Sequence, residues 1–260
     1  PGDPADGPPL PRTEAPPRVP HLCHPRRQAG RQDHLGVIKN PRFVKMTKTH
    51  GRPEMDKQQE HWEKVYQTKQ PNTVSWFQEH ATRSLEIIRS IGAPTDGQII
   101  DVGGGASTLV DDLLIDGFKH ISVLDLSASA LEVARKRLGA LGQNVTWITG
   151  DIRNVDLPAR TYDIWHDRAV FHFLTDQADR TAYVRQVMKS VKPGGHVIVA
   201  TFAPDGPDQC SGLPVARYDP EQLHGEFGPL FELLEHATEE HKTPWGSVQH
   251  FVYCHCLTPH

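Results

Sequence analysis

The sequence predicts an α/β protein built on a doubly wound, mostly parallel sheet with helices on both faces. Two observations lead to this fold class. From about residue 98 onward, short apolar runs rich in β-branched residues alternate with helical segments. These segments are long enough to carry the chain back across a sheet, as the pairing of parallel strands requires.

The expected strands and helices follow one another closely between residues 98 and 202. The expected strands are Gln98–Val102, Ile121–Leu126, Val145–Ile148, Tyr162–His166 and His196–Phe202. The expected helices are Thr108–Leu114, Ala128–Leu138 and Ala178–Val191. Two later strands, Phe231–Glu239 and Val248–Cys256, are separated only by a turn-rich segment at residues 242–246. Because no helix lies between them, we expect these two strands to pair antiparallel.

Composition divides the 260 residues into three regions. Residues 1–50 hold ten of the 22 prolines and nine Lys and Arg against four Asp and Glu. We expect this tail to be disordered, because it has too little apolar surface to bury. Residues 56–95 are expected to form a helical cap, in which Trp62, Val65 and Tyr66 share one helix face. Residues 96–260 are expected to form the ligand-binding domain.

Charge and apolar content limit the classes of partner. Residues 51–260 hold 19 Lys and Arg against 28 Asp and Glu, which opposes a large nucleic-acid-binding face. No stretch approaches the roughly 18 to 20 apolar residues of a membrane-spanning helix. We therefore expect neither a nucleic-acid nor a membrane partner.

The four cysteines include no C-x-x-C pair, which favours a reducing, cytoplasmic location. The Arg-rich, acid-poor tail leaves organellar targeting open as an alternative. Cys254 and Cys256 lie two residues apart, so they share one face of a strand. We expect them to pack against the core, and we expect no metal site.

The strongest motif is an apolar strand that ends in Asp101-Val102 and runs into Gly103-Gly104-Gly105. Glycines allow the backbone to turn sharply and to approach a ligand closely. In open α/β sheets the ligand binds beyond the carboxyl ends of the strands. A plain tight turn would contain the same glycines, so the motif needs support from elsewhere in the chain.

Two further acidic residues supply that support. Asp125 ends the next expected strand, 24 residues after Asp101, where a carboxylate can accept both hydroxyls of a ribose. Asp151 follows the third strand, where it can accept the amino group of an adenine. Taken singly, Asp125 would also fit a helix cap and Asp151 a turn.

Together these strand ends resemble the class I S-adenosylmethionine-dependent methyltransferases. The family's first motif, an acid followed by three alternating glycines, corresponds here to Asp101, Gly103, Gly105 and Ser107, with serine as the last member. The turn Lys192-Pro193-Gly194-Gly195 is similar to the one before the family's fifth strand. The resemblance covers roughly residues 62–253 and implies seven strands, the last antiparallel.

The resemblance implies S-adenosylmethionine as the cofactor and S-adenosylhomocysteine as the product. The cofactor-binding residues that it implies are Asp101, Gly103, Gly104, Gly105, Asp125, Leu126, Asp151, Ile152 and Trp76. Trp76 is included because an aromatic face attracts a sulfonium, although core packing would equally explain it.

A dinucleotide-binding enzyme is the distant alternative. Its G-x-G-x-x-G loop would need a third glycine at Thr108. Asp101 would also repel a pyrophosphate, whereas it suits the ammonium and sulfonium of S-adenosylmethionine.

Four residues of the fourth strand region are the candidates for the acceptor side: His166, Asp167, Arg168 and His172. His172 is the first choice for a general base, since histidine takes protons near neutral pH. A core or cap role for His172 and an Asp167–Arg168 pair are the simpler alternatives. The segment is similar to the Asp-Arg/Lys-Gly motif of some small-molecule and some protein-lysine methyltransferases, with Ala169 in place of glycine.

We expect in-line displacement of the methyl group onto a small molecule, with a protein lysine side chain as the alternative acceptor. The loop at residues 203–214, which contains Cys210, is expected to face the substrate. The sequence leaves the acceptor atom and the oligomeric state open.

Overall fold

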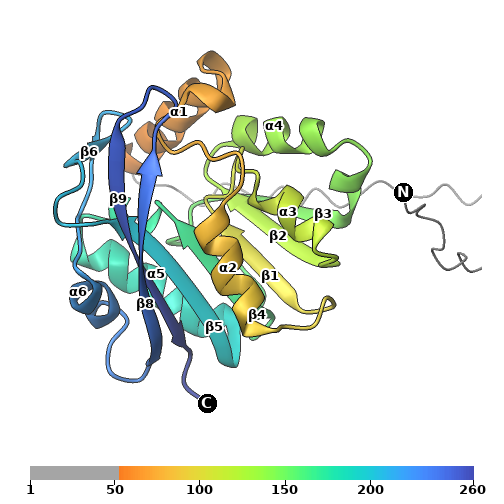
Figure 1. The fold of residues 1–260 in the computed structure, drawn as a ribbon, viewed down its shortest axis with the longest axis vertical. Coiled ribbons are helices and arrows are strands. Elements are labelled where there is room, and N and C mark those ends of the chain that lie inside the picture. Colours follow the sequence, from red (N-terminus) through yellow and green to blue (C-terminus); the bar gives the residue numbers. More distant parts are fainter. Residues whose placement is uncertain (1–52) are drawn as a thin grey trace, which may run out of the picture. The chain divides into compact units, whose positions relative to one another are not determined.

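The structure, a computed structural model, describes residues 53–260, with side chains from Lys57 onward. The expected tail at residues 1–50 lies outside these residues. The main sheet has seven strands in the order β3-β2-β1-β4-β5-β9-β8 (Figure 1). The strands are β1 (Gln98–Val102), β2 (His120–Asp125), β3 (Val145–Thr149), β4 (Tyr162–Arg168), β5 (Val191–Phe202), β8 (Glu232–Lys242) and β9 (Val248–Leu257).

Helices alternate with the strands, as the sequence predicts. They are α1 (Pro53–Thr68), α2 (Thr82–Ile91), α3 (Leu109–Ile115), α4 (Ala128–Leu138), α5 (Gln177–Ser190) and α6 (Pro220–Gly225). Short 3-10 turns are η1 (Pro71–Thr73), η2 (Leu141–Asn144) and η3 (Phe171–Phe173). None of the helices within residues 53–260 combines the length and apolar character needed to cross a bilayer.

Strand direction confirms the predicted doubly wound sheet. The strands β3, β2, β1, β4 and β5 pair parallel, and Ile99 of β1 lies opposite both Ile121 and Ile164. The last strand, β9, pairs antiparallel with both β5 and β8. Strand order reverses between β1 and β4, and this switch point is where sheets of this class bind ligands.

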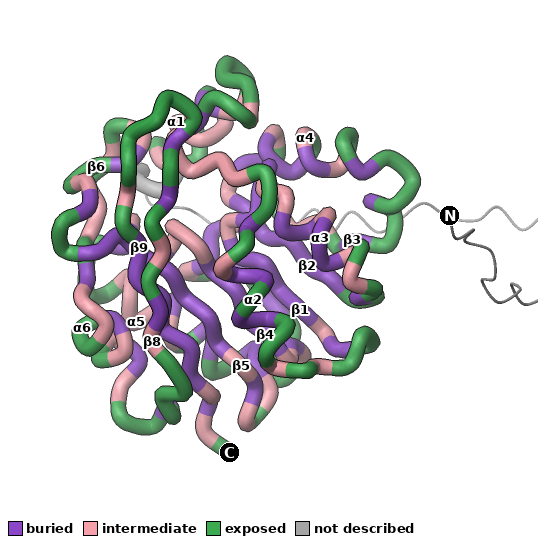
Figure 2. Tube along the Cα trace, viewed as in Figure 1, coloured by how far each residue is buried: buried purple, intermediate pink, exposed green. Residues whose placement is uncertain are grey.

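The core lies in two layers, because alternate strand residues point to opposite faces of the sheet. On one face Ile100, Trp165 and Val199 pack against Tyr183 and Val187 of α5. On the other face Ile99, Ile164 and Ile198 join side chains from α2, α3 and α4. Figure 2 shows the central strands buried along most of their length. Cys254 and Cys256 of β9 share the first layer, as their spacing predicts.

Three local features differ from the predicted elements. β5 begins at Val191 rather than His196, because Val191 pairs with Tyr162 across an irregular step in register. The expected loop at residues 203–214 contains a short hairpin of β6 (Gln209–Cys210) and β7 (Leu213–Pro214). Helix α6 was not predicted, although Asp219 and Gln222 form a capping box around its start.

A buried polar chain connects β4 to α5. The indole N–H of Trp165 donates to the hydroxyl of Tyr183 at 2.8 Å, and that hydroxyl donates to Asp167 at 2.7 Å. Asp167 also accepts the backbone N–H groups of Val170 and Phe171 at 2.9 and 3.1 Å. Asp167 therefore fixes the turn that follows β4.

Replacing Tyr183 by phenylalanine should lower the free energy of unfolding by about 1–3 kcal/mol, because Trp165 and Asp167 would each lose a buried partner. Urea unfolding followed by circular dichroism would measure the change. A loss below about 0.5 kcal/mol, the range of a neutral surface change, would show that this chain contributes little.

Candidate active site

The glycine loop after β1 has no room for side chains. Gly103 has φ +71°, and a Cβ on it would overlap the side chain of Val170. A Cβ on Gly104 would overlap the carboxylate of Asp101, and one on Gly105 would lie 2.6 Å from Asp125 Oδ2. The backbone of the loop therefore packs directly against Asp101 and Asp125, near the carboxyl ends of β1 and β2.

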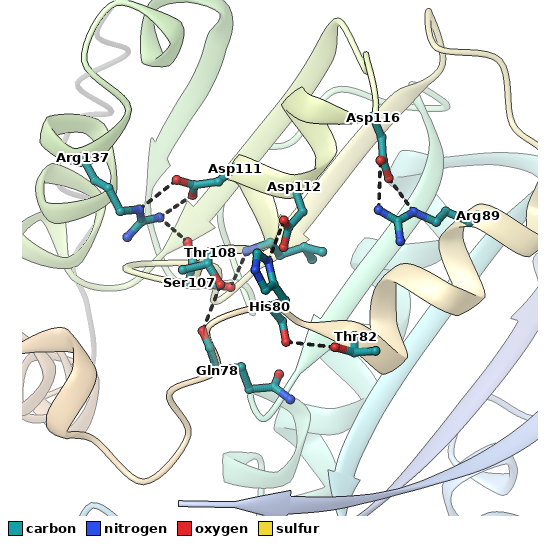
Figure 3. A network of polar contacts seen from close by, with 11 residues as sticks. Gln78, His80, Thr82, Arg89, Ser107, Thr108, Asp111, Asp112, Asp116 and Arg137 are labelled. Atoms are coloured by element: carbon teal, nitrogen blue, oxygen red, sulfur yellow. Dashed lines mark hydrogen bonds and ion pairs between the residues drawn. The ribbon is translucent and has the colours of Figure 1, made fainter. Parts of the chain in front are cut away.

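The outer half of the loop is held by side chains from other elements (Figure 3). Arg137 of α4 donates to the carbonyl oxygen of Ser107 at 2.6 Å and pairs with Asp111 at 2.6 Å. The hydroxyl of Thr108 donates to the carbonyl oxygen of Gln78 at 3.0 Å. Ser107 itself accepts the N–H of Leu109 at 3.1 Å, so the serine at the last motif position fixes the start of α3.

Asp125 lies at the tip of β2, 7% exposed. It accepts the N–H of Ser127 at 2.8 Å, while Ser127 caps α4 by accepting the N–H of Ala130 at 3.1 Å. The cap of the helix is thus Ser127, and Asp125 remains available to a ligand. Burial, together with the nearby charges of Asp101 and Glu63, raises the pKa of Asp125 to about 7.

Asp151 lies beyond β3 and is oriented by Arg153. The two side chains pair at 2.6 Å, and Arg153 also pairs with Asp179 at 2.7 Å. Asp151 additionally accepts the backbone N–H of Arg153 at 2.8 Å. The carboxylate is therefore fixed in place at the edge of the cleft described next.

Two adjoining hollows lie beyond the strand tips, with empty volumes of about 860 and 620 Å³. They share the lining residues Tyr66, Trp76, Gly103 and Arg168. Of the residues implied to bind the cofactor, the larger hollow is lined by Trp76, Gly103, Asp125, Leu126, Asp151 and Ile152. The smaller is lined by Trp76, Asp101, Gly103 and Gly104. Gly105 lines neither hollow and packs under Asp125.

The chemistry of this cleft fits an adenosyl compound with a cationic amino-acid end. Asp101 is 3% exposed, and its Oδ2 atom has no hydrogen-bond partner. A buried carboxylate oxygen without a partner is costly, and an ammonium group would satisfy it. Asp125, at the larger hollow, is placed to accept ribose hydroxyls.

The four candidates for the acceptor side occupy different surroundings. His166 lines the smaller hollow next to Asp101, whereas Arg168 lines both hollows. Asp167 is fully buried and bonded to Tyr183, so it does not pair with Arg168. Burial raises the pKa of Asp167 to about 6.

His172 lies away from the cleft. It is fully buried, lines neither hollow, and its ring centroid lies 4.5 Å from that of Phe173 and 4.7 Å from that of Phe202. Burial and the charge of Arg168 lower the pKa of His172 to about 3. This position corresponds to the core role and gives no support to a role as general base.

Arg168 is held by residues of β8 and β9. It pairs with Glu239 at 3.0 Å, donates to the hydroxyl of Tyr253 at 3.2 Å, and lies 4.0 Å from the ring centre of Phe251. Its positive charge is therefore matched by a carboxylate within the protein. Sequence reasoning missed Glu239, which lies 71 residues away along the chain.

An aromatic cluster covers the larger hollow. Trp62 of α1 contacts Tyr66, Trp76 and Phe173 edge-on or tilted, with ring centroids 5.3 to 6.4 Å apart. All four rings line this hollow. The sequence predicts a helical cap at residues 56–95 and a shared helix face for Trp62 and Tyr66, and the structure adds that both rings line the hollow.

Residues 99–195 match a model of the family described as "Methyltransferase domain". This stretch runs from β1 into β5 and contains the glycine loop and the three acids of the cleft. The match, the strand order and the cleft together support the predicted resemblance to the class I S-adenosylmethionine-dependent methyltransferases.

Among curated proteins, the chain is similar to human EEF1A lysine methyltransferase 2, with 23% identity over 68% of this chain and 75% of that protein. It is also similar to malonyl-[acyl-carrier protein] O-methyltransferase of Halalkalibacterium halodurans, with 36% identity over 41% of this chain and 40% of that protein. The match thus spans less than half the length of the second relative.

Two solved structures share the fold. A methyltransferase from Anabaena variabilis has a TM-score of 0.61 at 16% identity, over 80% of this chain and 96% of that one. The N-methyltransferase NodS of Bradyrhizobium japonicum, solved with S-adenosylhomocysteine, has a TM-score of 0.58 at 16% identity, over 77% of this chain and all of that one.

Gly104→Ala should abolish measurable binding of S-adenosylhomocysteine, because the added methyl group would displace Asp101. Isothermal titration calorimetry would measure the affinity. Gly225→Ala is the matched control, since its Cβ meets nothing within 4 Å, and it should bind as the parent does. Full binding by Gly104→Ala would contradict this account of the loop.

The affinity for S-adenosylhomocysteine should rise about tenfold between pH 6 and pH 8. In the free protein the pKa of Asp125 is raised to about 7, and ribose hydroxyls bind the ionised form best. Because the pKa of Asp125 is higher in the folded than in the unfolded protein, ionisation of this carboxyl also lowers the free energy of unfolding of the free protein as pH rises toward and through 7. Asp125→Asn should bind S-adenosylhomocysteine more weakly, with an affinity that does not change with pH. If its affinity still rose with pH, a group other than Asp125 would be responsible.

Proposed function

We propose that this protein transfers the methyl group of S-adenosylmethionine to a small, largely apolar acceptor bound beneath the aromatic cluster. The proposal rests on the side chains that line the larger hollow on the side of α1 and the β6–β7 hairpin, which we call its roof. The lining there comprises Trp62, Tyr66, Trp76 and Phe173 together with Cys210 and Leu213 of the β6–β7 hairpin. Apolar, mostly aromatic walls with few polar groups are typical of small-molecule sites.

Polar contacts tie this roof to the body of the domain. His61 of α1 lies 3.2 Å from the hydroxyl of Ser211 in the hairpin. At the other side of α1, Glu63 accepts the N–H of Ala128 at the start of α4 at 2.6 Å. Helix α1 therefore bridges the hairpin and the start of α4. A roof bridged in this way favours an acceptor that the cleft can enclose.

The bound cofactor would supply an electrophilic methyl group on a sulfonium. The protein itself would bind and orient the cofactor. Asp101 and Asp125 would hold the amino-acid end and the ribose, while the aromatic rings exclude water and attract the sulfonium. Positioning of this kind is the main contribution a protein can make to a displacement in which charge is lost.

Apart from Asp125 and Asp151, which we assign to the cofactor, the side chains that line the larger hollow do not include a good base at neutral pH. Burial raises the pKa of the Cys210 thiol to about 11, and burial likewise raises the pKa of Tyr66. Arg168 is paired with Glu239. We therefore favour an acceptor atom that carries a free lone pair at neutral pH, such as the nitrogen of a weakly basic aromatic amine or a sulfur.

A lysine side chain of a protein is the second candidate. It is favoured by the similarity to EEF1A lysine methyltransferase 2, which extends over 68% of this chain. The aliphatic part of a lysine side chain would also fit between the apolar walls of the larger hollow. The roof must then leave a channel for the rest of the substrate protein.

Transfer of labelled methyl from S-adenosylmethionine would separate the two candidates. The protein would be incubated with a panel of small apolar amines and thiols, and in parallel with whole-cell protein. We expect label in the low-mass fraction, and Gly104→Ala as the inactive control. Label confined to protein bands would contradict the small-molecule proposal and support the lysine acceptor.

Leu213→Trp should raise the KM of the best acceptor of that panel at least about tenfold, because the indole would fill the space beneath the roof. One large side chain misplaced in a pocket commonly costs about 1–3 kcal/mol. The affinity for S-adenosylhomocysteine should change less than twofold. Leu213→Met is the matched control, and equal effects on acceptor and cofactor would place Leu213 at the cofactor instead.

A further inference from the structure

The buried histidine His166 bonds one carboxylate oxygen of Asp101, and the other oxygen has no partner. We propose that His166 is a positioning residue, which fixes the Asp101 carboxylate so that its free oxygen receives the ammonium group of the cofactor's amino-acid end. His166 Nδ1 lies 2.7 Å from Asp101 Oδ1. Both residues are at most 3% exposed, so water competes little for this contact.

The direction of the hydrogen bond follows from the chemistry of its two partners. A carboxylate oxygen only accepts, so Nδ1 of His166 carries the hydrogen. The other ring nitrogen, Nε2, lies 2.8 Å from the hydroxyl of Ser84 on α2. With both nitrogens engaged, the imidazole cannot rotate without losing a buried partner.

The second oxygen of Asp101 is the one left for a ligand. Oδ2 is buried without a hydrogen-bond partner, and a Cβ on residue 104 would overlap it if that residue were not glycine. Both Asp101 and His166 line the smaller hollow. The histidine thus determines which oxygen faces the glycine loop.

Ser84 extends this arrangement toward Arg168. Its hydroxyl lies 3.4 Å from that of Tyr253, which donates to Glu239 at 3.0 Å, the partner of Arg168. Ser84, His166 and Asp101 have the connectivity of a hydrolase triad, but Ser84 is fully buried. No substrate carbonyl could reach its hydroxyl, so the triad orients Asp101 and performs no nucleophilic chemistry.

Two ligands separate this role from a merely structural one. S-adenosylhomocysteine carries the ammonium group, whereas 5′-methylthioadenosine has the same adenosine and sulfur without the amino-acid end. Calorimetry on the parent protein, His166→Phe, His166→Asn and Ser84→Ala would give the affinity for each. Asparagine keeps an N–H donor near the place of Nδ1, and phenylalanine keeps only the ring.

His166→Phe should weaken S-adenosylhomocysteine about tenfold to a hundredfold, the value of a hydrogen bond to a charged group. It should change 5′-methylthioadenosine less than twofold. His166→Asn should restore most of the lost affinity, and Ser84→Ala should show a smaller loss of the same selectivity. If His166→Phe fails to fold, Ser84→Ala and His166→Asn carry the comparison.

Equal losses for both ligands, or an unchanged affinity for S-adenosylhomocysteine, would overturn the proposal. Because both ligands bind without any acceptor, this result is independent of whether the acceptor is a small molecule or a lysine. Failure of the proposed function would leave the ratio of the two affinities untouched.

Discussion

The constraint on which the site depends is the burial of two carboxylates at the tips of neighbouring strands. Asp101 lies one residue before the end of β1, Asp125 ends β2, and each is less than 9% exposed. The charge of Asp101 adds to burial in raising the pKa of Asp125. The structure tolerates this pair because each acid receives one internal donor, His166 for Asp101 and the N–H of Ser127 for Asp125. The remaining oxygen atoms can then face a cationic ligand and its ribose.

Much of this could be predicted from the sequence, because local patterns determine it. The alternation of strands and helices, the glycine loop and the three acids all depend on residues close together in the chain. Strand pairing then brings their carboxyl ends to one edge of the sheet. The short hairpin around Ser211 and Gly212 was less visible, since both residues adopt positive φ in a segment with no regular apolar pattern.

The acceptor side was harder to predict, because its contacts join distant parts of the chain. Arg168 pairs with Glu239 rather than with its neighbour Asp167, and no sequence pattern relates positions 71 residues apart. The sequence predicts His172 as a general base because it follows a strand end, but its ring packs between phenylalanines. Residue type alone could not separate a buried histidine from a reactive one, since the difference lies in burial by segments far along the chain.

Glu63 of α1 influences the electrostatics of the cofactor site. This carboxylate binds the start of α4 and also adds to the charges that raise the pKa of Asp125. Glu63 and Asp101 thus both place negative charge near Asp125. The methyl donor carries a sulfonium, whereas the product sulfur is neutral. Methyl transfer thus removes a counter-charge from beneath the roof, so the same acids that favour the donor hold the spent product less firmly and favour its exchange.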